Sequence, residues 1–263
     1  MSDPPYAFDA PDADVIIQAP LQLGSQELKD FRAHKIILSV ASTLFHDMFS
    51  IPQPPQPAGS DTTLPIIQIA EPAGVFETFL RLIYPIEPPV VDSLQLVDNL
   101  FQLAEKYMAS GVHARVKQIF ASPSFLKDNP ILVYAVACRA NLDKEARLAI
   151  PHTFEIDLVR DVPLEKLQIM TAEMYHRLLL QHSLRRDRLI RSIDEVMPSR
   201  HDSCGSCVEQ LKKEIRLEIS GKPFLDRETL AKCFSSALPT CRKTCFLLLR
   251  NGPFISDLLR RID

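Results

Sequence analysis

The chain has 263 residues, a length that suits two small domains better than one large domain. Its 46% hydrophobic and 24% charged residues are typical of a globular protein and exclude a disordered, collagen-like or supercharged chain. The formal net charge of −3 argues against a general nucleic-acid-binding protein, and 7 glycines against 21 prolines argue against an enzyme that cradles a nucleotide.

The N-terminal segment, the apolar runs and the cysteines indicate the compartment. Residues 1–11 are rich in Pro and Asp, which predicts a disordered segment. They also lack the basic and apolar regions of a secretory signal. The longest clear apolar run, Ile131–Cys138, is far too short to span a bilayer. Six cysteines in so long a chain do not make a disulfide scaffold. We expect a cytoplasmic or nuclear protein with no membrane partner.

Short strands and short helices are predicted next. Asp14-Val-Ile-Ile is typical of a strand of β-branched residues, and residues 29–34 are predicted to form the returning strand of a hairpin. From Lys35 to Phe49 the apolar residues recur at helical spacing, with Ser42 as a cap between two short helices. Residues 52–61 hold four prolines and predict a surface loop, and residues 64–69 predict one more strand.

Helices are predicted for the rest of the chain. The first ones cover residues 74–84, 94–110 and 112–121, with Gly111 as the C-terminal cap of the second. Beyond residue 125 the apolar spacing predicts helices over 130–140, 143–150, 153–158, 164–183, 184–196, 228–238 and 241–249. An amphipathic helix is also predicted around Val208, Leu211, Ile215 and Ile219. The expected fold class is α+β, with a small sheet packed on helical hairpins and then a mostly α-helical region.

Residues 12–125 resemble a BTB/POZ domain. The resemblance rests on Asp14-Val-Ile-Ile, on Phe31-Arg-Ala-His-Lys-Ile-Ile-Leu-Ser, and on Ser42-Thr-Leu-Phe-His-Asp-Met-Phe. It extends to Val75–Tyr84 and to Leu100-Phe-Gln-Leu-Ala-Glu-Lys-Tyr-Met, which occur in the family's order. With its helical tail over 126–263, the chain resembles the BTB proteins common in mushroom-forming fungi.

The resemblance implies a non-enzymatic protein–protein interaction module. BTB domains bind a second copy, regulatory partners, or the cullin scaffolds of ubiquitin ligases. Cullin adaptors often carry a hydrophobic-x-Glu triplet after the helix that ends in Met-Phe, and this chain has Ile51-Pro-Gln there. This difference argues against a cullin partner, and a substrate adaptor of a cullin ubiquitin ligase is the alternative function.

Two groups of residues are candidates for partner binding. Asp14, His34 and Lys35 stand where the family has a charged pocket that can meet partners. Their alternative interpretation is a structural Asp14–Lys35 ion pair beside a half-buried histidine. Phe45, Met48 and Phe49 stand in the family's contact region, and their alternative interpretation is a place in the core.

The cysteines of the C-terminal half are candidates for a metal site. Cys204 and Cys207 have the C-x-x-C spacing, and Cys241 and Cys245 form a second pair; four thiolates at such spacings can hold zinc tetrahedrally. His182 or His201 could replace one thiolate. The alternative is that the thiols are small buried hydrophobes, because the second pair lies in an apolar stretch. We expect no other cofactor, and keep a zinc-stabilised regulator as a further alternative.

Sequence motifs of enzymes are missing from the chain. It contains no G-x-G-x-x-G, no G-x-x-x-x-G-K, no H-E-x-x-H and no G-x-S-x-G. The basic run from Arg185 to Arg191 is interrupted by Leu189 and Ile190 at helical spacing, which predicts a solvated helix face rather than an anion site. We therefore expect a protein that is not an enzyme and binds protein partners without direct contact to nucleic acid.

Overall fold

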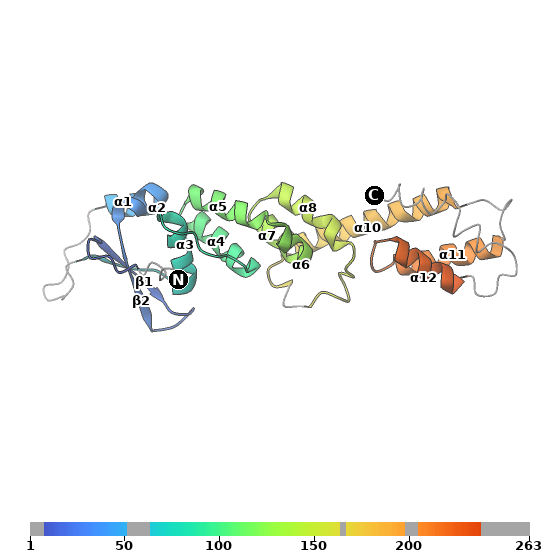
Figure 1. Ribbon diagram of the computed structural model, residues 1–263, viewed down its shortest axis with the longest axis horizontal. Helices are drawn as coiled ribbons and strands as arrows, with labels where there is room; N and C mark the ends of the chain where they lie inside the picture. The colour runs from blue at the N-terminus through green and yellow to red at the C-terminus, as the bar shows by residue number, and fades with distance from the viewer. Residues whose placement is uncertain (1–7, 52–63, 164–166, 198–204, 238–263) are drawn as a thin grey trace. The chain divides into compact units, whose positions relative to one another are not determined.

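The structure, a computed structural model, describes residues 8–51, 64–163, 167–197 and 205–237. The chain divides into two compact units, Met1–Phe125 and Leu126–Asp263 (Figure 1). The first unit combines a small sheet with helices, and the described part of the second unit is helical. The fold class is therefore α+β, as the sequence predicted.

A three-stranded sheet forms one side of the first unit. Strand β1 (Val15–Pro20) pairs antiparallel with β2 (Leu28–Ala33) and parallel with β3 (Ile66–Gln68), in the order β2-β1-β3. The central strand β1 is the most buried of the three, because its apolar residues face packed groups on both sides. The hairpin predicted from the β-branched run is confirmed, and β3 is shorter than the six residues expected.

Five helices pack with this sheet. They are α1 (Lys35–Ala41), α2 (Thr43–Ser50), α3 (Ala73–Ile83), α4 (Leu94–Lys106) and α5 (Ser110–Phe120). Helix α3 contacts β1, and α4 and α5 contact α3. The Ser42 Oγ accepts a hydrogen bond from the Phe45 backbone N–H at 3.1 Å, which confirms the predicted cap between α1 and α2.

Phe8 contradicts the expected disorder of residues 1–11. Its side chain is buried, and its ring meets the rings of Phe31 and Tyr84 edge to face at 6.0 and 5.2 Å. Its carbonyl accepts a hydrogen bond from the backbone N–H of Arg32 at 2.8 Å, on the edge of β2. Burial of the Phe8 ring stabilises this part of the segment despite the Pro- and Asp-rich composition around it. The segment is therefore ordered at Phe8.

Helix α4 ends earlier than the sequence predicted. Met108, not Gly111, takes the left-handed conformation after it, with φ of 49°. The N–H of Ala109 bonds to the carbonyl of Ala104 at 2.8 Å and that of Met108 to Glu105 at 3.0 Å, which is the Schellman arrangement. Gly111 lies inside the first turn of α5. The expected glycine cap is wrong because these backbone bonds hold a methionine in the position that usually favours glycine.

The helices of the later part of the chain are α6 (Pro123–Asp128), α7 (Pro130–Arg139), α8 (Asp143–Thr153), α10 (Ala172–Val196), α11 (Gly205–Glu218) and α12 (Arg227–Ala237). Two predictions are corrected. Residues 154–158 form turns instead of a helix, and one helix, α10, replaces the two expected over 164–183 and 184–196. The helix predicted over 241–249 and the loop over 52–61 lie outside the described residues.

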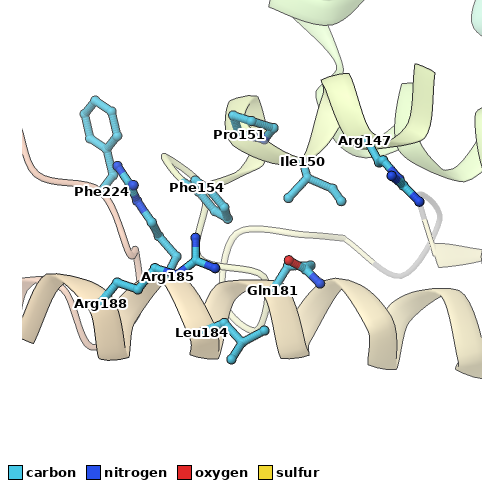
Figure 2. Close-up of a pocket in the computed structure, with 9 residues that line it drawn as sticks. All are labelled: Arg147, Ile150, Pro151, Phe154, Gln181, Leu184, Arg185, Arg188 and Phe224. Carbon is cyan, nitrogen blue, oxygen red and sulfur yellow. The ribbon is translucent and has the colours of Figure 1, made fainter. Parts of the chain in front are cut away.

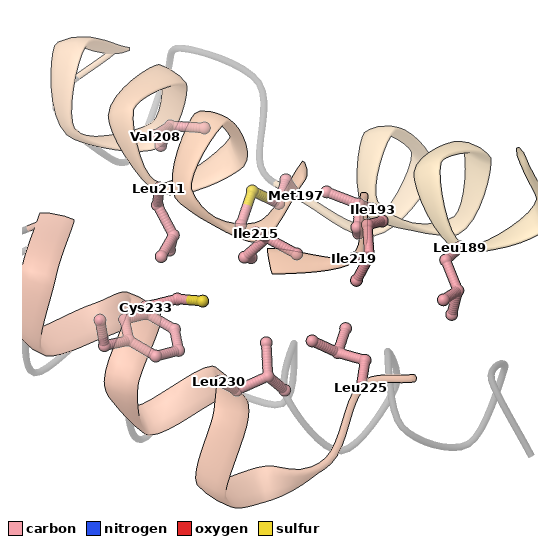
Figure 3. Packing of buried hydrophobic residues seen from close by; sticks show 11 residues of the cluster. Leu189, Ile193, Met197, Val208, Leu211, Ile215, Ile219, Leu225, Leu230 and Cys233 are labelled. Atoms are coloured by element: carbon pink, nitrogen blue, oxygen red, sulfur yellow. The ribbon is translucent and has the colours of Figure 1, made fainter. Parts of the chain in front are cut away.

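The second unit has its own apolar core around α10, α11 and α12 (Figure 3). The four residues of the predicted amphipathic stripe, Val208, Leu211, Ile215 and Ile219, are all buried in it. Ion pairs also connect α10 to α11. Asp194 of α10 lies 2.8 Å from Arg216 and 3.4 Å from Lys212, both on α11. Among the helices that the structure describes, none combines the length and the apolar character needed to cross a membrane.

Candidate protein-interaction surface

The charged residues predicted to meet a partner lie at the start of α1. The Asp14 Oδ1 accepts a hydrogen bond from the Lys35 backbone N–H at 2.7 Å, which satisfies a free donor of the first helical turn. The Lys35 ammonium lies 5.9 Å from the centre of the Phe49 ring. Asp14 therefore holds the Lys35 backbone, while the Lys35 charge lies over an aromatic face of α2.

His34 is held by two partners. Its backbone N–H donates to the Tyr84 hydroxyl at 2.9 Å, and its Nδ1 lies 3.2 Å from the same oxygen. Its Nε2 lies 3.4 Å from Asp12 Oδ1. A neutral ring with its proton on Nε2 fits both contacts, because the Tyr84 hydroxyl can then donate to Nδ1. The ring is half-buried, and it fixes the entry of the chain into α1.

A stack of aromatic rings connects the surface of α2 to the core. The Phe49 ring stacks on Phe45 at 5.8 Å, and Phe45 stacks on Tyr107 at 4.9 Å, with interplanar angles of 15° and 14°. Phe45 has no exposed surface, whereas Phe49 and Met48 are partly exposed. The prediction that Phe45 contacts a partner is therefore corrected, because a side chain with no exposed area supports the core instead.

The inner end of the stack is fixed by a buried polar group. Glu71 accepts hydrogen bonds from the Lys106 ammonium and, at 3.0 Å, from the Tyr107 hydroxyl. Burial by itself would raise the pKa of Glu71, but the hydrogen bonds from Lys106 and Tyr107 outweigh it and lower that pKa. The Ser42 hydroxyl donates to the Tyr107 carbonyl at 2.5 Å. Tyr107 is thus held by both its backbone and its side chain.

Two exposed apolar residues were missed as site candidates. Ile36 and Val40, one turn apart on α1, are 70% and 83% exposed, while Leu38 between them is fully buried. Five of the seven residues of α1 are apolar, and a helix packed on one side cannot bury all of them. That excess was the available signal. Ile51, after α2, is 63% exposed.

We define the α1–α2 surface by five of the partly or fully exposed residues of this helix pair and by Ile51 after α2: Lys35, Ile36, Val40, Met48, Phe49 and Ile51. Helices α1 and α2 pack directly against each other. The surface presents one positive charge and five apolar side chains on a hairpin whose underside is anchored by Phe45 and Leu38. Such an arrangement can bury apolar area against another protein without unfolding the unit.

The structure describes two of the predicted zinc ligands, Cys207 and His182. Cys207 is partly buried and packs against the core of the second unit, whereas Cys204, Cys241, Cys245 and His201 lie outside the described residues. His182 is buried and its Nε2 lies 2.9 Å from Thr153 Oγ1. Within the described ranges, no three His, Cys, Asp or Glu side chains are grouped as a metal site. Zinc binding stays a prediction.

Comparison with known sequence families locates a match in the first unit. Residues 14–123 match the BTB/POZ domain, which covers the sheet, the α1–α2 surface and the Glu71–Tyr107 group. The comparison with curated proteins finds no match. BTB/POZ domains are protein-interaction domains that do not themselves catalyse reactions. The first unit of this chain, over residues 14–123, is a BTB/POZ domain.

Proposed function

We propose that the protein docks a protein partner, a second copy of itself or a scaffold or regulatory protein, through the α1–α2 surface. The observation that carries the proposal is the exposure of Ile36 and Val40 on a helix that is anchored beneath by Leu38. A single apolar side chain on a surface is ordinary, but Ile36 and Val40 lie one turn apart on α1, and α2, which packs against α1, adds the partly exposed Met48 and Phe49.

The proposed mechanism is burial of apolar area. Ile36, Val40 and Phe49 supply that area, and the Lys35 charge over the Phe49 ring favours a partner with a carboxylate at the rim of the contact. Because Phe45 and Tyr107 hold Phe49 from below, little side-chain freedom remains to be lost when a partner binds.

The test compares the double variant Ile36→Asp/Val40→Asp with wild type. Light scattering after size exclusion measures self-association of the full chain, and affinity capture from its own cell lysate with mass spectrometry identifies other partners. Val90→Asp is the matched control, because Val90 is 87% exposed but lies in the loop between α3 and α4. We expect the double variant to lose the contact and the control to keep it.

The captured protein distinguishes the two versions of the proposal. Recovery of a cullin with its RING subunit, lost in the double variant, would identify a substrate adaptor. Self-association lost in the double variant, without a cullin, would identify an assembly module. If self-association and every captured protein persist in Ile36→Asp/Val40→Asp, a docking role for the α1–α2 surface is wrong.

A further inference from the structure

A basic groove lies in the second unit and is lined by none of the residues that the proposed function uses. It has a volume of about 560 Å³ and is lined by the end of α8, the residue after it, the middle of α10 and Phe224 before α12 (Figure 2). Three arginines line it, Arg147 on α8 and Arg185 and Arg188 on α10. No carboxylate is among its lining residues.

Arg147 and Arg188 leave positive charge for a ligand to neutralise. In the part of the chain that the structure describes, Arg147 and Arg188 have neither an ion pair nor a hydrogen bond through their side chains, and both are exposed. Arg185 is half-buried, with its guanidinium 5.7 Å from the centre of the Phe154 ring. Arginine presents a planar fork of donors that suits carboxylates. The groove therefore favours an anionic occupant.

The groove is also apolar between its charges. Ile150, Phe154 and Leu184 line it, and Figure 2 shows Arg147 at one end, Arg188 at the other, and Ile150 and Phe154 between them. An occupant that pairs with both ends and fills the space between them carries negative groups on both sides of an apolar group.

Phe154 is fixed before any ligand arrives. Its ring lies between two groups, since it meets His182 edge to face at 5.2 Å and lies under Arg185. The preceding residue, Thr153, is buried. Its hydroxyl is hydrogen-bonded both to His182 and to the Ile150 carbonyl. A preformed apolar wall binds with less loss of side-chain freedom than a mobile one.

We propose that this groove binds an acidic peptide segment of a partner protein, with one bulky apolar side chain seated against Phe154 and Ile150 and flanking carboxylates paired with Arg147 and Arg188. The site is separate from the α1–α2 surface, and it gives the helical unit a binding role of its own. The basic run of α10, which the sequence predicted to be a solvated helix face, includes a half-buried arginine beside an aromatic ring.

The test measures binding of a fluorescein-labelled peptide with the core Glu-Glu-Phe-Glu-Glu to the full chain by fluorescence anisotropy. We expect saturable binding that weakens as salt is raised. The peptide Gln-Gln-Phe-Gln-Gln should bind at least about tenfold more weakly, because it lacks the carboxylates, and Glu-Glu-Ser-Glu-Glu should also bind more weakly, because it lacks the apolar anchor.

Variants then assign the site. Arg147→Glu/Arg188→Glu should weaken binding by about tenfold or more, whereas Arg191→Glu, an exposed arginine of α10 outside the groove, should change it little. Ile36→Asp/Val40→Asp should have no effect, which keeps this result separate from the test of the α1–α2 surface. The proposal is overturned if the acidic peptide does not saturate, if Arg191→Glu matches the double variant, or if only a phosphorylated peptide or inorganic phosphate binds.

Discussion

Phe45 and Phe49 occupy the same face of α2 one turn apart, yet they serve different purposes. Phe45 lies between Phe49 and Tyr107 with no exposed area, and Phe49 is the outermost ring of the stack. Sequence spacing predicted that both rings share a face but could not show how deep each one lies. Depth is decided by Tyr107, which is sixty-two positions further along the chain than Phe45.

Phe45→Ala is expected to destabilise the BTB/POZ domain by about 3–5 kcal/mol, because it removes a fully buried ring from the centre of a stack. Phe49→Ala is the matched variant and should destabilise it less, since its ring is partly exposed. Urea unfolding followed by circular dichroism measures both. Equal losses of unfolding free energy for the two variants would contradict the assignment of Phe45 to the core.

His182 is a buried histidine that folding keeps neutral. The Thr153 hydroxyl donates its proton to the Ile150 carbonyl at 2.7 Å, so it can only accept from His182 Nε2. Burial lowers the pKa of His182 to about 4, with Arg186 acting in the same direction and Asp157 against it. The folded state therefore resists protonation in the range where an ordinary imidazole takes up a proton.

The second unit should consequently lose stability as the pH falls from about 6.5 to about 4. In that window the unfolded chain binds a proton at residue 182 that the folded chain does not, and the loss reaches at most about 3 kcal/mol. His182→Gln keeps a donor for Thr153 and cannot titrate. Thermal melts of wild type and His182→Gln from pH 4.5 to 7.5 measure the difference, and parallel pH profiles would contradict this role.

At the scale of elements, the turn after α8 is held by its own carboxylates and by Gly221. Asp157 Oδ1 accepts hydrogen bonds from the backbone N–H groups of Val159 and Arg160 at 3.0 and 3.1 Å. Lys222 pairs with Asp161 at 2.9 Å. A Cβ atom on Gly221 would lie 2.3 Å from Asp157 Oδ2, closer than such atoms approach each other. The glycine is therefore needed for a close approach.

Gly221→Ala is expected to destabilise the second unit by about 1–3 kcal/mol, because Asp157 cannot withdraw without losing its two backbone hydrogen bonds. Gly74→Ala is the control, since a Cβ atom there meets nothing within 4 Å and the residue lies in α3. The control should be neutral or stabilising by about 0.5–1 kcal/mol. Calorimetric melts compare the two, and an unchanged melt for Gly221→Ala would refute the close approach.

Elements with a clear local pattern were predictable. The β-branched run of β1, the serine between α1 and α2, and the stripe of α11 each carry their own signal. The segment after Thr153 was not predictable from apolar spacing, because the Asp157 carboxylate bonds to nearby backbone N–H groups in place of a helix. The start of α10 depends on Thr171, whose hydroxyl accepts from the Met174 N–H at 3.2 Å. A threonine at this position is a capping signal that the spacing of apolar residues does not contain.

At the scale of the whole molecule, the chain has two compact units, each with buried apolar residues of its own. Phe79 is fully buried in the first unit, and Ile215 is fully buried in the second. The sequence predicted a mostly helical region after residue 125, and the described elements there are helices. It could not predict the basic groove, because Arg147 of α8 and Arg188 of α10 line the same groove through the tertiary fold rather than through their spacing in the sequence.

Two compact units predict two unfolding transitions in a calorimetric scan of the full chain. Phe79→Ala should lower only one transition and Ile215→Ala only the other, each removing about 2–5 kcal/mol from its own unit. A single transition that both variants lower equally would contradict this expectation and would mean that the units unfold as one.

The order of the strands has a consequence for what the sheet can recruit. Strand β2 is an outer strand of charged composition, with Lys29, Asp30 and Arg32, and the Phe8 carbonyl already takes the Arg32 N–H on its open side. The opposite outer strand, β3, has only three residues. Unpaired strand edges favour aggregation and the addition of a foreign strand. Charged residues, a short strand, and another segment of the chain bonded to the edge each disfavour these two events. Addition of a foreign strand is therefore disfavoured at both outer strands of the described sheet.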